Sequence, residues 1–338
     1  MGGGNGSTRT PIYLKIHYFT GGIYMTINDR ILPELRQAYS QFPGFQLDED
    51  LEWSRRLLDL PPLEESELVV TTNRTIPRGD GGEMLVKIYE PVKRNHDKLP
   101  AMLWIHGGGF VMGHPDMDDL LCERFVQTAN CVVISVDYRL APEHPYPAAI
   151  EDCYAGLVWM TTEAPTLGID SKRVAIAGAS GGGGLTAALA LMARDKGGPS
   201  IIFQMPLYPM LDNRNETASS YEITDSHATW SRTNNLTAWR MYLGEEQDTH
   251  ELSPYAVPSR ADNLAGLPPT YTCIGQLDLF RDETLDYVTR LAQAGVDVEM
   301  NLYPGSFHCF EVFVPDAEIS LRASQNYLDA MARALNGR

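Results

Sequence analysis

A serine flanked by glycines is the feature of this sequence that points most directly to chemistry. The motif is Gly-Ala-Ser-Gly-Gly at residues 178–182, after a largely apolar run at 173–177 and before a helical pattern. A sharp turn from a strand into a helix exposes the serine Oγ above the sheet and tolerates only small neighbours. The alternatives are an ordinary glycine-rich turn and a phosphate-binding loop, but the latter would need a P-loop lysine or the spacing of a dinucleotide fingerprint. We therefore predict that Ser180 is a nucleophile.

A second glycine motif, His-Gly-Gly-Gly-Phe at 106–110, follows the apolar run 101–105. When a nucleophile attacks an acyl group, negative charge develops on the carbonyl oxygen, and preorganised backbone N–H groups stabilise it. We predict an oxyanion hole formed by the N–H groups of Gly108, Gly109 and Gly181, because glycines leave such groups unobstructed. The alternative is a glycine hinge in a loop. His106 precedes the serine in the chain and is predicted to be structural rather than a base.

An acid and a histidine are expected after the serine, each at the carboxyl end of a strand. Asp278 follows the apolar run 271–274, and His308 follows the run 296–302. Asp282 competes with Asp278, but it falls in the first turn of a predicted helix, where the helix dipole already explains a carboxylate. The sequence thus predicts a triad in which His308 is the general base and Asp278 orients it. Aromatic side chains are predicted to line an apolar substrate pocket nearby, namely Phe110, Tyr208, Trp230, Phe280 and Phe307.

The composition excludes several classes of protein. Because 27 Lys and Arg stand against 44 Asp and Glu, the formal net charge is −17, and no basic run could neutralise a phosphate backbone, so no nucleic-acid partner is expected. The five cysteines are widely spaced and odd in number, which argues against disulfides or a zinc site and favours a cytoplasmic location. No apolar run approaches the roughly 18 residues of a membrane span. Neither a metal nor another cofactor is expected.

Apolar segments and helical patterns alternate from residue 101 onward, which predicts an α/β fold with a mostly parallel, doubly wound sheet. The predicted parallel strands are short and rich in β-branched residues, and they lie at 101–105, 131–136, 174–177, 201–205, 271–274 and 296–302. The predicted helices lie at 117–129, 148–162, 182–195, 282–294 and 315–335. Ahead of them, segments 68–76 and 83–89 flank a Gly-Asp-Gly-Gly turn, which predicts an antiparallel hairpin.

Two segments outside this alternation are predicted to form a helical cap. The first is 25–60, with helical spacing of its apolar residues, and the second is an insertion at about 208–250 that is polar but carries Trp230 and Trp239. An insertion of this size between strands is typical of a cover over a binding site. The catalytic domain is then expected at 61–338. Residues 1–24 lack the pattern of a signal peptide and are interpreted as a leader or tag-like segment.

With these motifs in view, the chain resembles the hormone-sensitive-lipase-like carboxylesterases, bacterial family IV of the α/β-hydrolase superfamily. The resemblance covers nearly the whole length from about residue 26 and rests on the motifs at 106–110, 136–149, 178–182 and 278–282. It implies a helical cap, the serine, aspartate and histidine triad named above, and hydrolysis of short to medium acyl esters. Within 136–149, Tyr138, Arg139 and Glu143 are expected to be structural, with a buried ion pair bracing the loop beneath the site.

Three residues depart from the family pattern. The family usually has Asp or Thr in place of Ala179 and often Ala in place of Gly181, differences expected to alter packing rather than the nucleophile. Cys309 stands where a glycine usually follows the histidine, and it is expected to reshape the pocket wall rather than to act as a nucleophile. An amidase, formamidase or carbamate hydrolase would keep the same triad, and a non-catalytic receptor on this fold is a further alternative. The expected partner is a small-molecule ester, and a homodimer is an open alternative to a monomer.

Overall fold

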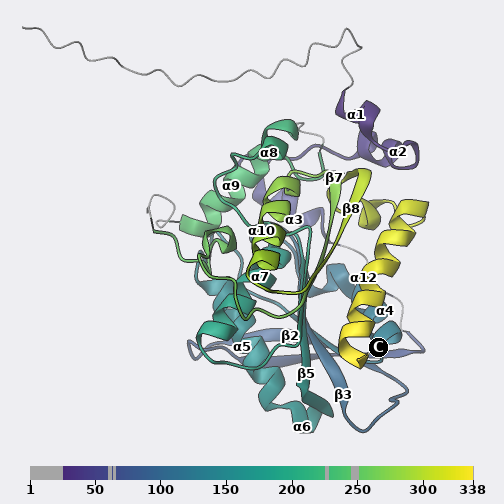
Figure 1. The fold of residues 1–338 in the computed structure, drawn as a ribbon, viewed down its shortest axis with the longest axis vertical. Coiled ribbons are helices and arrows are strands. Elements are labelled where there is room, and N and C mark those ends of the chain that lie inside the picture. Colours follow the sequence, from purple (N-terminus) through teal and green to yellow (C-terminus); the bar gives the residue numbers. More distant parts are fainter. Residues whose placement is uncertain (1–25, 60–62, 64–65, 225–227, 245–250, 338) are drawn as a thin grey trace, which may run out of the picture.

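The computed structural model describes residues 26–59, 63, 66–224, 228–244 and 251–337, so the predicted leader at 1–24 lies outside the described residues. Within these ranges the core is an eight-stranded sheet in the order β1-β2-β4-β3-β5-β6-β7-β8 (Figure 1). β2 pairs antiparallel with both β1 and β4, and every neighbouring pair from β4 to β8 is parallel. The strands are β1 (Val69–Pro77), β2 (Glu83–Pro91), β3 (Leu99–Ile105), β4 (Val132–Val136), β5 (Ile169–Ala179), β6 (Phe203–Leu207), β7 (Thr270–Leu277) and β8 (Val298–Phe307).

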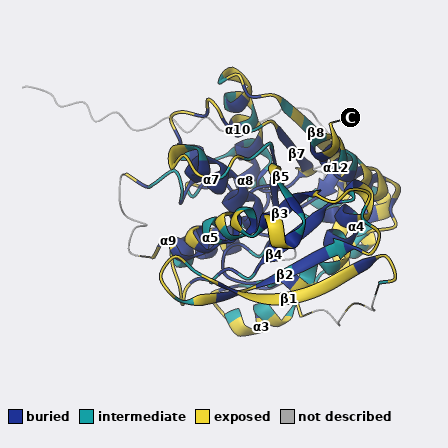
Figure 2. Cartoon of the chain, turned by 90° about the horizontal axis from the view of Figure 1, so that it is seen from below, coloured by how far each residue is buried: buried dark blue, intermediate teal, exposed yellow. Residues whose placement is uncertain are grey.

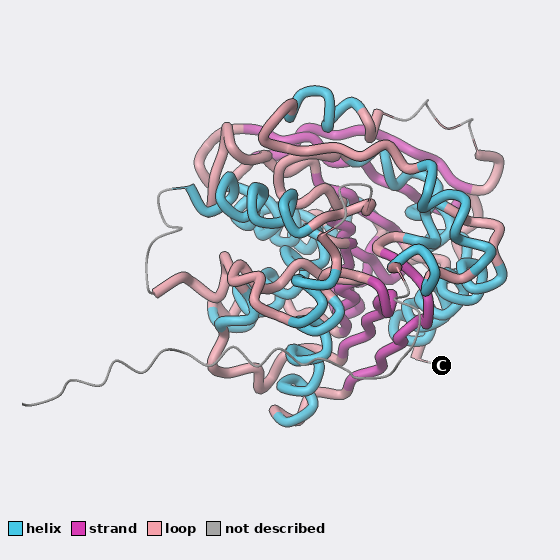
Figure 3. The backbone as a smooth tube through the Cα atoms, turned by 90° about the horizontal axis from the view of Figure 1, so that it is seen from above, coloured by secondary structure: helices cyan, strands magenta, loops and turns pink. Residues whose placement is uncertain are grey.

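Helices cover both faces of this sheet (Figures 1 and 3). On one face α4 (Asp119–Ala129) packs against α12 (Glu318–Asn336), and on the other α5 (Ala148–Thr162) packs against α7 (Gly181–Asp195). The remaining helices are α1 (Ile27–Arg30), α2 (Pro33–Gln41), α3 (Leu51–Arg56), α6 (Ala164–Leu167), α8 (Ala218–Glu222), α9 (Arg232–Leu243), α10 (Arg281–Gln293), α11 (Phe310–Phe313) and the 3-10 helices η1 (Pro115–Asp118) and η3 (Pro258–Arg260). In the described part of the chain, no helix is long and apolar enough to cross a bilayer.

Burial explains why the strands differ in sequence. Every residue of β3 and β4 is buried, so these strands are continuously apolar, as expected for strands covered on both faces. β1 is exposed over most of its length and forms one edge of the sheet, where polar residues are tolerated (Figure 2). The middle strands are therefore shielded from solvent, and the residues predicted to do chemistry follow the carboxyl ends of β5, β7 and β8.

The predicted fold class is confirmed, and several predicted boundaries are wrong. The sequence predicts a strand at 296–302, but β8 runs from Val298 to Phe307 and pairs with Leu277 of β7 beyond a bulge. Proline is tolerated there because β8 is an edge strand. The helix expected at 117–129 starts as η1 and becomes α-helical only at Asp119, and the last helix begins at Glu318 rather than at 315.

The two segments predicted to form a cap contact each other directly. The side chain of Asn234 in α9 donates to the Phe45 carbonyl at 3.0 Å and accepts from the Leu47 N–H at 3.1 Å. Arg30, the last residue of α1, forms an ion pair with Glu222 of α8. These contacts join chain segments that are far apart in sequence. The division into a cap at 25–60 and a catalytic domain at 61–338 stays a prediction.

Candidate active site

Ser180 lies in the turn that joins β5 to α7, with φ +57° and ψ −117°. A positive φ is uncommon for a residue with a side chain, so neighbouring structure has to hold this conformation. The Ser180 N–H donates to the Leu207 carbonyl at 2.9 Å, and the Met210 N–H donates to the Ser180 carbonyl at 3.0 Å. A Cβ atom at Gly182 would overlap the Ile105 carbonyl oxygen, so only glycine lets the turn pack against β3. The turn is therefore fixed on both sides.

The side chains of Asp278, His308 and Ser180 form a continuous chain of hydrogen bonds. His308 Nδ1 lies 2.7 Å from Asp278 Oδ2, and His308 Nε2 lies 3.0 Å from Ser180 Oγ. An ionised carboxylate only accepts hydrogen bonds, so a neutral imidazole donates from Nδ1 and accepts the Ser180 hydroxyl proton at Nε2. Asp278 is fully buried, and its Oδ1 accepts from the Phe280 N–H at 2.9 Å. The rings of Tyr208 and Phe280 both lie 5.2 Å from the imidazole and restrict its rotation.

The glycine loop after β3 lies against the serine. A Cβ atom at Gly107 would lie 3.6 Å from Ser180 Cβ, and one at Gly181 would lie 2.8 Å from the Gly109 nitrogen. Among the described residues, no backbone carbonyl accepts a hydrogen bond from the N–H groups of Gly108, Gly109 or Gly181. These donors remain available to a ligand next to the serine, an arrangement that can stabilise a developing oxyanion.

Comparison with known proteins identifies the family. The model for the alpha/beta hydrolase fold family matches residues 102–312. Esterase LipI of Mycobacterium tuberculosis is 36% identical over 86% of this chain and 91% of its own length, and carboxylesterase NlhH of the same species is 34% identical over 90% and 96%. A solved bacterial heroin esterase aligns with a TM-score of 0.86 and 37% identity, covering 92% of this chain and 99% of that chain. The chain belongs to the hormone-sensitive-lipase-like carboxylesterases.

A cavity of about 180 Å³ opens at Ser180 and His308 in this carboxylesterase. Its wall is mostly apolar and draws on separate parts of the chain, with Leu57 and Leu58 after α3, Met112 and Met117 after the glycine loop, and Val312 and Phe313 in α11. No local motif marks these residues, because only the fold brings them together. Sequence reasoning missed them, although position next to the glycine loop was a signal for Met112, Met117 and Asp118.

The predicted substrate-pocket aromatics divide into two groups. Tyr208 and Trp230 line the Ser180 cavity, whereas Phe110, Phe280 and Phe307 do not. Phe110 is buried with its ring 4.2 Å from that of Tyr242, and Phe280 is buried with its ring 5.2 Å from the His308 imidazole. Phe307 packs against Tyr39 at 5.4 Å. Aromatic side chains near a site also form the core that supports it, so only some of those predicted from the sequence border the cavity.

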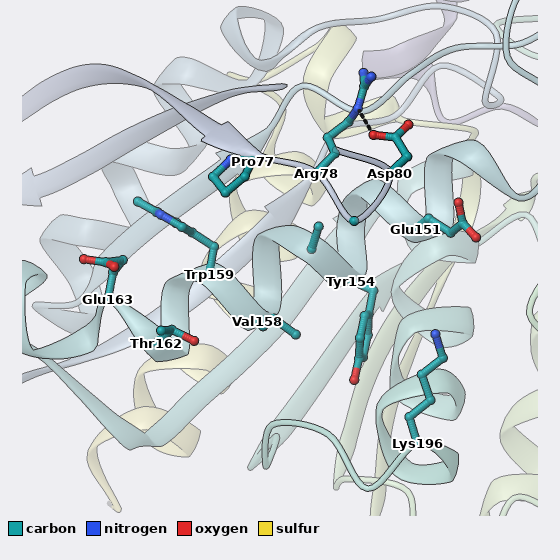
Figure 4. Close-up of a pocket in the computed structure, with 12 residues that line it drawn as sticks. Pro77, Arg78, Asp80, Glu151, Tyr154, Val158, Trp159, Thr162, Glu163 and Lys196 are labelled. Carbon is teal, nitrogen blue, oxygen red and sulfur yellow. Dashed lines mark hydrogen bonds and ion pairs between the residues drawn. The ribbon is translucent and has the colours of Figure 1, made fainter. Parts of the chain in front are cut away.

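A wider surface hollow of about 720 Å³ lies between the β1–β2 turn and α5, and none of the predicted site residues line it (Figure 4). Its wall includes the Arg78–Asp80 ion pair and the aromatic rings of Tyr154 and Trp159. Lys196 lies over the Tyr154 ring at 4.6 Å. The hollow is larger than the Ser180 cavity but contains no nucleophile with a base, so cavity size alone does not locate the chemistry.

Asp282, the competing acid, contacts other groups. It accepts from the Ser219 N–H at 2.7 Å and forms an ion pair with Arg281 at 2.7 Å. Burial alone would raise the pKa of Asp282, but the hydrogen bonds from Arg281 and Ser219 outweigh it and lower the pKa below the usual value. Its carboxylate therefore links α10 to α8. Within the described ranges, no group of three or more His, Cys, Asp or Glu side chains is placed to hold a metal ion.

His106 and Cys309 are the other reactive side chains near the serine. His106 is fully buried and stacked on Tyr138 at 4.1 Å, and burial lowers its pKa to about 4, so it is neutral at physiological pH. Cys309 lines the Ser180 cavity and has φ +59°. Burial raises the pKa of its thiol well above the usual value, which disfavours the thiolate that a nucleophile requires.

The ion pair expected around Arg139 forms with a partner that sequence reasoning missed. Arg139 holds the buried Asp152 of α5 through bonds of 2.8 and 2.9 Å, which braces the loop after β4. Glu143 is instead half-exposed and bonds Arg55 of α3 at 2.7 and 2.8 Å. The guanidinium of Arg55 holds the pKa of Glu143 at about 2. Glu143 thus ties the N-terminal helices to the loop near the site.

Proposed function

We propose that this carboxylesterase hydrolyses esters of short to medium acyl chains through an acyl-enzyme, with Ser180 as nucleophile, His308 as general base and Asp278 as the acid that orients it. The observation that carries this proposal is the hydrogen-bond chain, in which both links to the imidazole are 3.0 Å or shorter. The order serine, aspartate, histidine along the chain also matches the α/β-hydrolase arrangement.

In the proposed mechanism, His308 Nε2 removes the hydroxyl proton while Ser180 Oγ forms a bond to the ester carbonyl carbon. The N–H groups of Gly108, Gly109 and Gly181 stabilise the oxyanion. The tetrahedral intermediate then collapses, the C–O bond to the alcohol breaks, and His308 returns the proton to the leaving alcohol. Water attacks the acyl-enzyme in the same way and releases the acid. Asp278 stays ionised throughout and stabilises the imidazolium.

The cavity supports a limit on acyl length. It encloses about 180 Å³ and is bounded by bulky apolar side chains such as Trp230 and Phe313. Burying each methylene of an acyl chain against such a wall contributes about 0.8 kcal/mol until the space is filled. We therefore expect kcat/KM for p-nitrophenyl esters to rise over the first few methylenes and then fall. Matching p-nitroanilides, run in parallel, test whether amides compete as substrates.

Replacing the nucleophile tests the proposal directly. Ser180→Ala should lower kcat by roughly 10⁴ to 10⁶, because only the oxyanion hole and substrate binding remain. The exposed Ser40 provides a matched control, and Ser40→Ala should keep wild-type activity. An organophosphate should label Ser180 stoichiometrically. Activity of more than a few per cent in Ser180→Ala, or labelling of another serine, would overturn the proposal.

A further inference from the structure

A carboxylate, that of Asp118, lines the otherwise mostly apolar wall that the described residues give the Ser180 cavity. Asp118 lies at the end of η1 and at the N-cap position of α4, yet its carboxylate does not cap that helix. Instead, Asp118 Oδ2 accepts from the Trp104 indole N–H at 2.7 Å. This bond fixes the orientation of the carboxylate. No described group donates a hydrogen bond to its Oδ1.

Neighbouring cations are engaged with other carboxylates. Lys87 Nζ forms ion pairs with Asp116 at 2.6 Å and with Asp119 at 2.7 Å. His114 attracts the Asp118 carboxylate at longer range and lies 3.7 Å from Asp59 and from Asp116. Within the part of the chain that the structure describes, no Lys, Arg or His forms an ion pair with Asp118. The Asp118 carboxylate therefore has no directly bound cation among the described residues.

An ionised carboxylate in such surroundings is unfavourable unless a positive group compensates it. Burial raises the pKa of Asp118 to about 6, so the carboxylate is mostly ionised above neutral pH. Since Asp118 lines a cavity that also contains Ser180, a substrate bound there can supply the compensating charge. Trp230 lines the same cavity, and an indole ring provides a second attraction for a cation that lies over its face.

We propose that Asp118 makes this enzyme selective for esters that carry a quaternary or protonated ammonium group. The inference rests on the proposed function, because it assigns a substrate class to the same Ser180 cavity. Among the described residues, no Lys or Arg lines that cavity to repel the cation, and the apolar wall accommodates the methyl or methylene groups around the nitrogen. Asp118 acts in this scheme as a specificity residue and takes no part in bond making or breaking.

A matched pair of esters tests this inference. Acetylcholine and 3,3-dimethylbutyl acetate have the same shape but differ in having nitrogen or carbon at the branched centre, and thus in charge. We expect wild type to show a higher kcat/KM for the cation, and Asp118→Asn to lower the ratio of the two values by about tenfold at about pH 8. Asn keeps the acceptor oxygen for Trp104 but removes the charge.

Asp116→Asn is the matched control, because it makes the same charge change nearby at an exposed residue that does not line the cavity. In Asp116→Asn, the ratio of kcat/KM for acetylcholine to kcat/KM for 3,3-dimethylbutyl acetate should equal that of wild type. An unchanged ratio in Asp118→Asn, or an equal fall in both variants, would overturn the inference, since the second result would reflect only the overall charge of −17.

Inhibition of wild type provides a test that does not depend on a folded variant. Choline and its neutral analogue 3,3-dimethylbutanol are compared as competitive inhibitors of 3,3-dimethylbutyl acetate hydrolysis. We expect choline to have a lower inhibition constant by about tenfold, and equal constants would overturn the inference. Hydrolysis that persists in Ser180→Ala, or that is absent for both esters, would instead overturn the proposed function and the inference with it.

Discussion

Asp278 and Asp282 lie close together in the sequence but contact different groups, and this separates their expected roles. Asp278 bonds His308, whereas Asp282 bonds Ser219 and Arg281. Asp278→Asn should lower kcat by about 10⁴ because the amide favours the wrong imidazole tautomer. Asp282→Asn should instead lower the free energy of unfolding with little effect on kcat. Ester kinetics, with folding checked by circular dichroism, measure both effects. The reverse ranking would reassign the acid to Asp282.

Glu311 is a buried carboxyl group next to Tyr208, and no described Lys, Arg or His forms an ion pair with it. Burial raises its pKa above the ordinary 4.5, so the folded state retains a proton that the unfolded chain releases. The free energy of unfolding should therefore fall as pH rises above 4.5, by about 1.4 kcal/mol per pH unit, until the folded-state pKa is reached. Glu311→Gln removes this titration but keeps the shape of the protonated side chain.

Thermal unfolding from about pH 4.5 to pH 7.5 measures the effect. We expect the Tm of wild type to fall more steeply with pH than the Tm of Glu311→Gln. The exposed Glu67 offers a control, and Glu67→Gln should follow the wild-type curve. Parallel curves for wild type and Glu311→Gln would show that Glu311 does not titrate differently in the two states.

At the scale of elements, the N-terminal helices and the insertion meet at Trp230. Its ring packs against Phe45 at 6.1 Å, and its indole N–H donates to Asn235 of α9 at 3.1 Å. A Cβ atom at Gly109 would overlap the same ring, so Trp230 also covers the glycine loop. One side chain thus connects both segments of the predicted cap to the cavity at Ser180.

Trp230→Ala should change chain-length preference more than it changes kcat for the shortest ester. The side chain lines the cavity and its indole N–H bonds Asn235, so its loss should remove about 1 to 3 kcal/mol of discrimination for each methylene that it touches. The kcat/KM profile over p-nitrophenyl esters of increasing length measures this shift. Trp239→Ala is the comparison, because Trp239 is buried against Phe110 outside the cavity. A profile unchanged in Trp230→Ala would contradict the role of the cap.

For the whole molecule, sequence patterns predicted the fold because the pattern of each short segment agrees with the place of that segment in the sheet. Continuous apolar runs predicted β3 and β4, and the strand-to-helix serine motif predicted the turn at Ser180. The positions of Asp278 and His308 could be predicted because the carboxyl ends of parallel strands meet at one edge of the sheet. These signals are each contained in a short stretch of sequence.

What the sequence did not predict depends on contacts between distant segments. The partner of Arg139 is Asp152 in another element, and Glu143 bonds Arg55 in the N-terminal segment. Charge type alone cannot select one carboxylate among the 44 Asp and Glu in the chain. The cavity wall also combines residues that are distant in sequence, because Leu57 and Phe313 line the same cavity. Such pairings follow from the packed fold rather than from spacing.

The cavity at Ser180 has a consequence for how the chain is made. Part of its wall, at Leu57 and Leu58, leaves the ribosome well before Ser180, and His308, Val312 and Phe313 leave well after it. A nascent chain that has already formed the turn at Ser180 still lacks its proposed base and the part of the cavity wall that follows in the sequence. Ester hydrolysis should therefore begin only when the C-terminal strand and helices have docked. The time at which hydrolysis of a chromogenic ester begins during translation would then report when folding is complete.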